Sequence, residues 1–274
     1  MTLANEASIY SQNPSPRRER RISNVPKLER SRPPQSYMRG YLDSLVRDGE
    51  FDLAHDTVEY YFRNHEGTVS DQLFSVAMQS ISLPYHRWMR SEQHMLTGEQ
   101  RQYAYRTSVN LATLALEYHG TSSATAQKIR TRGIASETLF YVAATRLMSA
   151  GNNLPLVITP APLSMDASSS RHGVAREGVD FIAYYHDFTV PIQVKTTSKR
   201  EQGYRPEILV IALDQIAAPE DHTHTQLLES YQREVKDETP HRTACNAQDR
   251  LYNKLQQHVA TQEGALLRDN IALY

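Results

Sequence analysis

Two short apolar runs, 179–185 and 188–196, constrain the fold of this chain more than any other feature. Both are rich in β-branched and aromatic residues, which favours strands over helices. Only His186 and Asp187 separate the runs, so we expect an antiparallel hairpin. The Asn-Gly or Asp-Gly pair that is typical of a tight turn is missing from the connection.

The alternation of side chains along a strand predicts which residues of this hairpin share a face. If the chain turns between the two runs, Asp180 falls opposite the segment from Gln193 to Lys195. Gln193 and Lys195 lie on one face of the second strand, whereas Ile192 and Val194 point to the other. One carboxylate, one amide and one ammonium group therefore meet at the open end of the hairpin.

Each charged residue of this group also has a purely structural interpretation. Asp180 would then be a surface acid on an edge strand, and Lys195 a solvent-facing lysine that discourages edge pairing. Aspartate is depleted in strands, so its place beside an apolar run needs a cause. The combination of acid, amide and lysine favours a functional role for both residues.

The elements around the hairpin are predicted from apolar spacing and from capping residues. Residues 37–119 have helical spacing, and Thr97-Gly-Glu-Gln100 has the form of a capping box. We expect a short helix over 122–132 that ends at Gly133, and a second helix that begins at Glu137 behind a Ser136 cap.

Further strands and helices complete the expected core. Leu156-Val-Ile158 is the expected first strand, and 208–213 is a continuous apolar run typical of a strand covered on both faces. Two helices separated by Pro240 are expected over 221–274. The order is therefore helix, then four strands, then helices.

This pattern resembles the PD-(D/E)xK, or restriction-endonuclease-like, nuclease superfamily. In that family an acid at one strand is followed, on the next strand, by an acid or glutamine two places before a lysine. Asp180 and Gln193-Val194-Lys195 match these positions, and Val179 stands where the family usually has proline. The resemblance covers roughly residues 130–215. It implies an α/β fold with a mixed four- to five-stranded sheet flanked by helices, preceded here by an N-terminal helical subdomain.

The resemblance also implies a divalent metal, Mg²⁺ with Mn²⁺ able to replace it, and assigns roles to individual residues. Its ligands would be the Asp180 carboxylate, the Gln193 side-chain oxygen and the Val194 backbone carbonyl. Lys195 would orient the attacking water or stabilise the charged transition state. Glu137 is a further ligand by analogy; the alternative is a glutamate that only stabilises the dipole of its helix from the first turn. Glu177 is a weaker candidate ligand, because strand parity places it on the opposite face from Asp180.

Nucleic-acid contacts would have to come from local basic patches, because the net charge is −1 and the pI is near 6.8. The candidates that flank the hairpin are Arg171, His172, Lys199 and Arg200. Residues 1–36 form a proline-rich basic tail that we expect to be disordered, and it either grips phosphates or is merely solvated. His222-Thr-His224 has no partners at zinc spacing and is interpreted as a polar loop.

The expected organisation is a tail (1–36), a helical subdomain (37–120), a nuclease-like α/β core (121–220) and helices that pack on it (221–274). The single cysteine, Cys245, fits a reducing compartment, so we expect a cytoplasmic protein. No apolar run is long enough for a membrane span, so no membrane partner is expected.

The sequence thus predicts a metal-dependent endonuclease acting on DNA rather than RNA, and a homodimer is compatible with the family. Two alternatives stay open. One is a nuclease fold without turnover that binds nucleic acid or a protein. The other is a helical scaffold with an incidental sheet.

Overall fold

The fold is given by a computed structural model that describes most of the chain from residue 40 onward. The described residues are 40–42, 44–45, 47–50, 53–54, 56–57, 71–90, 96–121, 125–150, 156–161, 178–185, 188–197, 206–217 and 224–271. The tail expected over 1–36 lies outside them.

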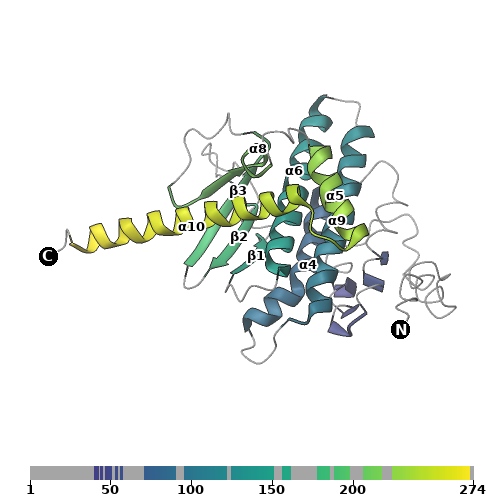
Figure 1. The fold of residues 1–274 in the computed structure, drawn as a ribbon, viewed down its shortest axis with the longest axis horizontal. Coiled ribbons are helices and arrows are strands. Elements are labelled where there is room, and N and C mark those ends of the chain that lie inside the picture. Colours follow the sequence, from purple (N-terminus) through teal and green to yellow (C-terminus); the bar gives the residue numbers. More distant parts are fainter. Residues whose placement is uncertain are drawn as a thin grey trace, which may run out of the picture.

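A four-stranded mixed sheet forms the centre of the molecule, with strand order β1-β2-β3-β4 (Figure 1). The strands are β1 (Leu156–Pro160), β2 (Phe181–Tyr185), β3 (Phe188–Lys195) and β4 (Leu209–Ala212). The first three strands pair antiparallel, and β4 pairs parallel to β3. The expected α/β class with a mixed sheet flanked by helices is confirmed.

The predicted hairpin is β2 and β3. Tyr185 pairs with Phe188 at the turn, and Phe181 pairs with Ile192 at the other end. The connection is therefore 186–187, as the two apolar runs indicated. β-Branched and aromatic side chains fit a pleated, half-buried surface, which is why this stretch forms strands.

The two edge strands follow from local chemistry. β1 ends at Pro160, and a proline that cannot donate to the ladder is tolerated at an edge. β4 is the other edge strand and lies parallel to β3, with Ile192 opposite Leu209. The predicted strands at 156–158 and 208–213 are both present, with slightly different ends.

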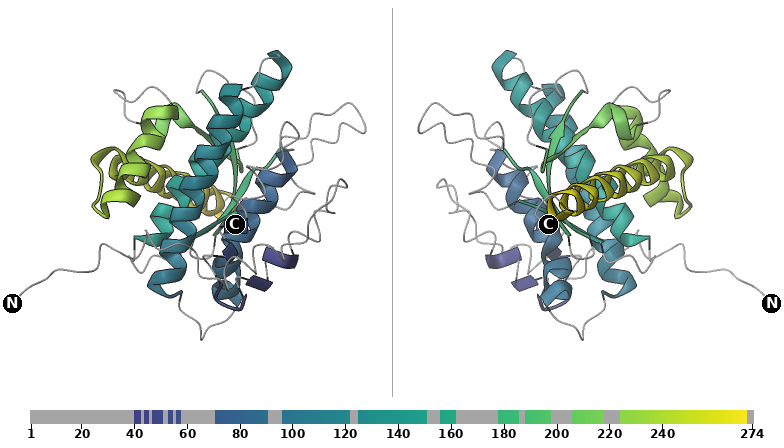
Figure 2. Two further views of the ribbon diagram at one scale, coloured as in Figure 1. Left: turned by 90° about the vertical axis from the view of Figure 1, so that its right-hand side faces the viewer. Right: turned by 90° about the vertical axis from the view of Figure 1, so that its left-hand side faces the viewer.

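Helices surround this sheet (Figures 1 and 2). They are α4 (Asp71–Arg90), α5 (Gly98–Thr121), α6 (Thr125–Ser149), α8 (Leu213–Ile216), α9 (His224–Asp237) and α10 (Arg242–Ile271). The predicted capping box at the start of α5 is confirmed: the Thr97 N–H donates to Gln100 Oε1 at 2.9 Å, and the Gln100 N–H donates to Thr97 Oγ1 at 3.1 Å. Pro240 separates α9 from α10, as expected.

The predicted helix break at Gly133 is wrong. α6 runs without interruption through Gly133 and Ser136, and the Ser136 hydroxyl donates to the Arg132 carbonyl at 2.9 Å, as serine does inside a helix rather than at a cap. A glycine in a helix costs only about 1 kcal/mol. The buried side chains of Thr131 and Ile134 on either side of Gly133 offset that cost. Glu137 is therefore an interior residue of α6, and the helix-dipole explanation for it no longer applies.

α6 covers one face of the sheet. Its Phe140 ring lies 4.7 Å from the ring of Phe181, and its Tyr141 ring lies 5.9 Å from it, measured between centroids. All three aromatic side chains are fully buried. The same core continues from Leu42 to Val259 through α4, α5, α9 and α10. The face of the sheet that α6 covers is thus fixed by tightly packed aromatic residues.

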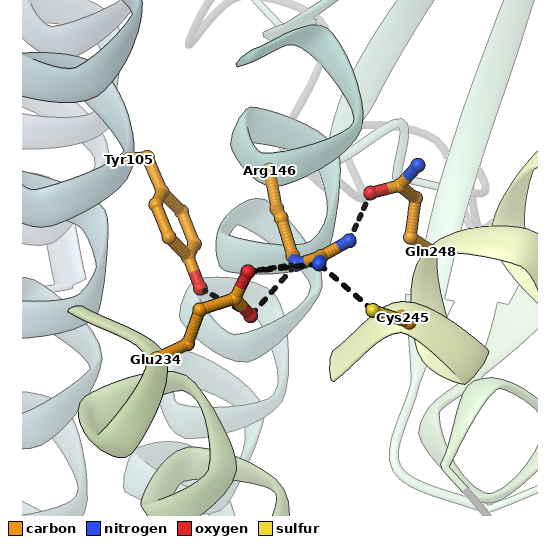
Figure 3. A network of polar contacts seen from close by, with 5 residues as sticks. All are labelled: Tyr105, Arg146, Glu234, Cys245 and Gln248. Carbon is orange, nitrogen blue, oxygen red and sulfur yellow. Dashed lines mark hydrogen bonds and ion pairs between the residues drawn. The ribbon is translucent and has the colours of Figure 1, made fainter. Parts of the chain in front are cut away.

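A buried ion pair joins the helices on the far side of α6 (Figure 3). Arg146 donates to both carboxylate oxygens of Glu234, with Nη2 to Oε1 at 2.8 Å and Nε to Oε2 at 2.9 Å, and the two side chains are only 11% and 13% exposed. Tyr105, Cys245 and Gln248 complete the network. Burial alone would lower the pKa of Arg146, but the hydrogen bonds and charge of Glu234 raise it above its usual value.

Candidate functional site

The sheet pairing assigns the predicted site residues to faces. Val190, Ile192 and Val194 belong to the core beneath α6, so alternation places Gln193 and Lys195 on the opposite face of β3. Phe181 also belongs to the core beneath α6, so Ile182 takes the opposite face. The register ends at Phe181 and Ile192, and the Asp180 N–H binds the Ile192 carbonyl, so the shared face of Asp180, Gln193 and Lys195 stays a prediction.

Asp180 continues the sheet one residue before β2. Its N–H donates to the Ile192 carbonyl at 2.9 Å, and its carbonyl accepts the Ala161 N–H at 2.9 Å. Its carboxylate oxygen Oδ2 accepts the Val194 N–H at 2.6 Å. This short charge-assisted bond fixes the half-buried carboxylate against the main chain of β3. The Val194 side chain itself points into the core, so only its backbone takes part in the site.

Gln193 carries an unsatisfied group. Its side chain is 7% exposed, and its Oε1 atom has no hydrogen-bond partner in the described part of the chain. A buried acceptor without a partner costs about 1–3 kcal/mol, so each one needs an explanation. Gln193 directly precedes Val194, whose N–H binds the Asp180 carboxylate. Gln193 Oε1 is therefore a buried oxygen without a partner among the described residues, one residue away from a backbone group that contacts Asp180.

Lys195 and Glu137 approach the same end of the hairpin from different elements. Lys195 is the last residue of β3 and is half-buried. Glu137 is half-buried on α6, next to Ser136, whose hydroxyl lies 3.0 Å from that of Thr196 just beyond Lys195. Glu137 thus comes to the end of β3 from the side of the sheet that α6 covers.

The arrangement is poor in acids. No group of three or more His, Cys, Asp or Glu residues that could hold a metal occurs among the residues that the structure describes. A cation at Asp180 would therefore use amide and backbone oxygens together with water. Mg²⁺ accepts such a set, because it needs only one or two carboxylates and keeps several waters.

The structure does not describe the residues that we predicted to contact phosphates. Arg171, His172, Lys199 and Arg200 lie outside the described residues, and so does Glu177. Their roles stay predictions.

The sequence did not predict a network of hydroxyl and histidine side chains that lies at the end of β3. His224 is the first residue of α9 rather than part of a polar loop, and its Nε2 lies 3.2 Å from Ser136 Oγ. In α5, His119 Nδ1 lies 2.9 Å from Thr131 Oγ1 of α6. Burial, together with the positive charges of Arg132 and His119, lowers the pKa of His224 to about 4. His224 is therefore neutral near pH 7.

The sequence contains no local sign of this network, since Thr196 lies 60 residues and His224 lies 88 residues from Ser136. Only a known register between α6 and β3 would have revealed it.

None of the described helices is long and apolar enough to cross a membrane. Comparisons with protein-family models, with curated proteins and with solved structures found no match to this chain.

Proposed function

We propose that this chain is a divalent-metal-dependent endonuclease that hydrolyses phosphodiester bonds, in DNA in preference to RNA. The observation that carries the proposal is the buried Gln193 Oε1, unpartnered among the described residues and one residue before the Val194 N–H that binds the Asp180 carboxylate. The order of α6, three antiparallel strands and a parallel β4 supports a restriction-endonuclease-like core.

The residues present fit a hard divalent cation, Mg²⁺ or Mn²⁺ in its place. The Asp180 carboxylate and Gln193 Oε1 would hold it, with the Val194 backbone carbonyl as a further oxygen donor. Glu137 comes from the face that α6 covers, so its carboxylate would reach the cation only past the end of β3. The Val194 N–H bond already fixes the Asp180 carboxylate, so little side-chain freedom is lost on binding. Binding would also give the Gln193 oxygen the partner that it lacks.

Phosphodiester hydrolysis needs a positioned water and compensation of the negative charge that builds up on the phosphate. When bound, the cation supplies positive charge for both purposes. The Lys195 ammonium would orient the attacking water or stabilise the transition-state charge. Asp180 would hold the cation from the β2 side, and Lys195 would act on the water or the phosphate from β3.

The partners follow from the same chemistry. Nucleic-acid phosphates would bind the basic residues that flank the hairpin in the sequence, Arg171, His172, Lys199 and Arg200. Two copies of the chain would be needed to cut both strands of a duplex together, so we include a homodimer in the proposal. A cytoplasmic location remains part of the same proposal.

The test is a cleavage assay on plasmid and on duplex, branched and single-stranded DNA and RNA, with Mg²⁺, with Mn²⁺ and with a chelator. The decisive variant is Asp180→Asn. An asparagine oxygen still accepts the Val194 N–H, so the fold is kept while the negative charge is lost. The exposed Asp237→Asn serves as a matched control, since it removes the same charge far from the hairpin.

We expect metal-dependent cleavage by the native chain and by Asp237→Asn, and a loss of at least about 100-fold in Asp180→Asn. Equal cleavage by Asp180→Asn would reject the assignment and point to a contaminating nuclease.

The scarcity of acids favours one second candidate, a nuclease-like module that binds nucleic acid or a protein without turnover. It predicts a DNA shift at low salt that neither metal nor Asp180→Asn alters, with no cleavage of any substrate.

A further inference from the structure

The Ser136 hydroxyl is the meeting point of three elements. It lies 3.0 Å from the Thr196 hydroxyl at the end of β3, and 3.2 Å from Nε2 of His224 at the start of α9. It also contacts the Arg132 carbonyl one turn earlier on its own helix, at 2.9 Å. Ser136 is only 1% exposed, so water does not compete for these bonds.

Ser136, Thr196 and His224 together form a junction, and its protons can be assigned by counting hydrogen-bond donors and acceptors. A hydroxyl donates one hydrogen bond and accepts two. The Arg132 carbonyl can only accept, so Ser136 donates its proton there. Thr196 and His224 must then both donate to the Ser136 oxygen, which requires a proton on Nε2 of His224. Neutral His224 in its Nε2–H form meets this requirement.

The junction stands between two residues of the proposed site. Ser136 precedes Glu137 on α6, and Thr196 follows Lys195 at the end of β3. The 3.0 Å contact between the two hydroxyls therefore ties the turn of α6 that carries Glu137 to the end of the strand that carries Lys195. His224 adds a third support, because it ties the start of α9 to the same oxygen.

We propose that Ser136 is a positioning residue that holds Glu137 and Lys195 in their working separation, and that His224 locks it by donating from Nε2. Neither residue touches the substrate. This inference rests on the proposed nuclease function. It adds two positioning residues to the residues proposed for the site itself.

A contact between α5 and α6 provides a matched control. Ser108 is also 1% exposed, donates to a carbonyl of its own helix at 2.7 Å, and lies 2.7 Å from the hydroxyl of Thr145 on α6. Ser108→Ala therefore removes the same kind of buried contact, but away from β3. Its effect on cleavage reports a general loss of packing.

The experiment compares Ser136→Ala, Thr196→Val and His224→Phe with Ser108→Ala, all at a temperature where each variant is folded. Cleavage kinetics are measured together with hydrogen exchange of the β3 end and of the first turn of α9. We expect kcat to fall about 10- to 100-fold in the three junction variants, with KM nearly unchanged, since small displacements of catalytic groups have effects of this size. Exchange at 194–197 should rise in the same three variants but not in Ser108→Ala.

Conservative variants that keep a donor provide the rescue. Thr196→Ser retains the hydroxyl, and the amide of His224→Gln can replace the Nε2–H group. Both should recover most of the lost kcat and of the exchange protection. The inference is overturned if Ser136→Ala cleaves like Ser108→Ala, or if the donor-keeping variants are as impaired as Thr196→Val and His224→Phe.

Failure of the proposed function gives a different result. If the native chain cleaves nothing with either metal, the nuclease proposal and the positioning role fall together. Normal cleavage by Ser136→Ala in an active protein rejects the positioning role alone.

Discussion

The carboxylate of Asp180 accepts a hydrogen bond of 2.6 Å from the backbone N–H of Val194, across the open end of the hairpin. The bond closes the β2–β3 ladder with a side chain where regular pairing stops. It also holds an acidic group against the residue that follows Gln193, whose buried amide oxygen has no partner among the described residues. The same aspartate thus has a structural role and the chemistry of a cation ligand, and substitutions can separate the two.

Asp180→Ala should destabilise the protein, whereas Asp180→Asn should do so less. Alanine loses a hydrogen bond to a charged group, worth about 1.5–3 kcal/mol, and leaves the Val194 N–H without this partner. Asparagine keeps an acceptor at the same place. Urea unfolding without metal measures the difference, and equal stability of Asp180→Ala and the native chain would show that the bond carries no net free energy.

Gln193→Met should leave the metal-free protein as stable as before or make it more stable. Methionine fills a similar volume and removes a buried acceptor that lacks a partner, a defect that costs about 1–3 kcal/mol. The native chain should gain stability when Mn²⁺ is added, because a ligand that binds only the folded state raises the unfolding free energy. Gln193→Met should lose most of that gain. Thermal unfolding at several Mn²⁺ concentrations checks both statements, and a large destabilisation in Gln193→Met without metal would contradict the first.

Glu234→Gln should be among the most destabilising single changes in the helical part. It removes the charge that compensates buried Arg146 and weakens the hydrogen bond that Tyr105 donates to residue 234 (Figure 3). Breaking a buried pair on one side costs about 3–5 kcal/mol. The double change Arg146→Met with Glu234→Leu should cost less than Glu234→Gln, since no unpaired charge remains. A double change that proves worse than the single one would reject this interpretation.

His224 should make stability depend on pH between about 4 and 6.5. Its pKa in the folded protein is about 4, below the 6.5 of the exposed side chain, so between these values the unfolded chain binds more protons. The full stability is present above pH 6.5 and is progressively lost as the pH falls toward 4. His224→Gln cannot titrate, so its unfolding free energy should decline less over this window. The difference between the two proteins, followed by urea unfolding at fixed salt, isolates His224 from every other titrating group. A constant difference would contradict the low pKa.

The sequence predicted the hairpin because local signals determine it. The runs 179–185 and 188–196 are rich in β-branched and aromatic residues, and the two-residue gap between them determines which residues pair. The capping box at Thr97 was equally local and was found.

The errors lie where packing outweighs local preference. Gly133 and Ser136 suggested a break, but the buried neighbours of Gly133 keep α6 continuous. The junction of Ser136, Thr196 and His224 depends on contacts between segments far apart in the chain. No periodicity within either segment carries that information.

Calorimetric titration with Mn²⁺, on the native chain and on Asp180→Asn side by side, tests the central claim most directly. The account predicts saturable binding to the native chain and binding weakened by at least about tenfold in Asp180→Asn, because the substitution removes the negative charge of a proposed ligand while keeping its hydrogen bond. Absence of binding to the native chain, or equal binding by both proteins, would contradict it.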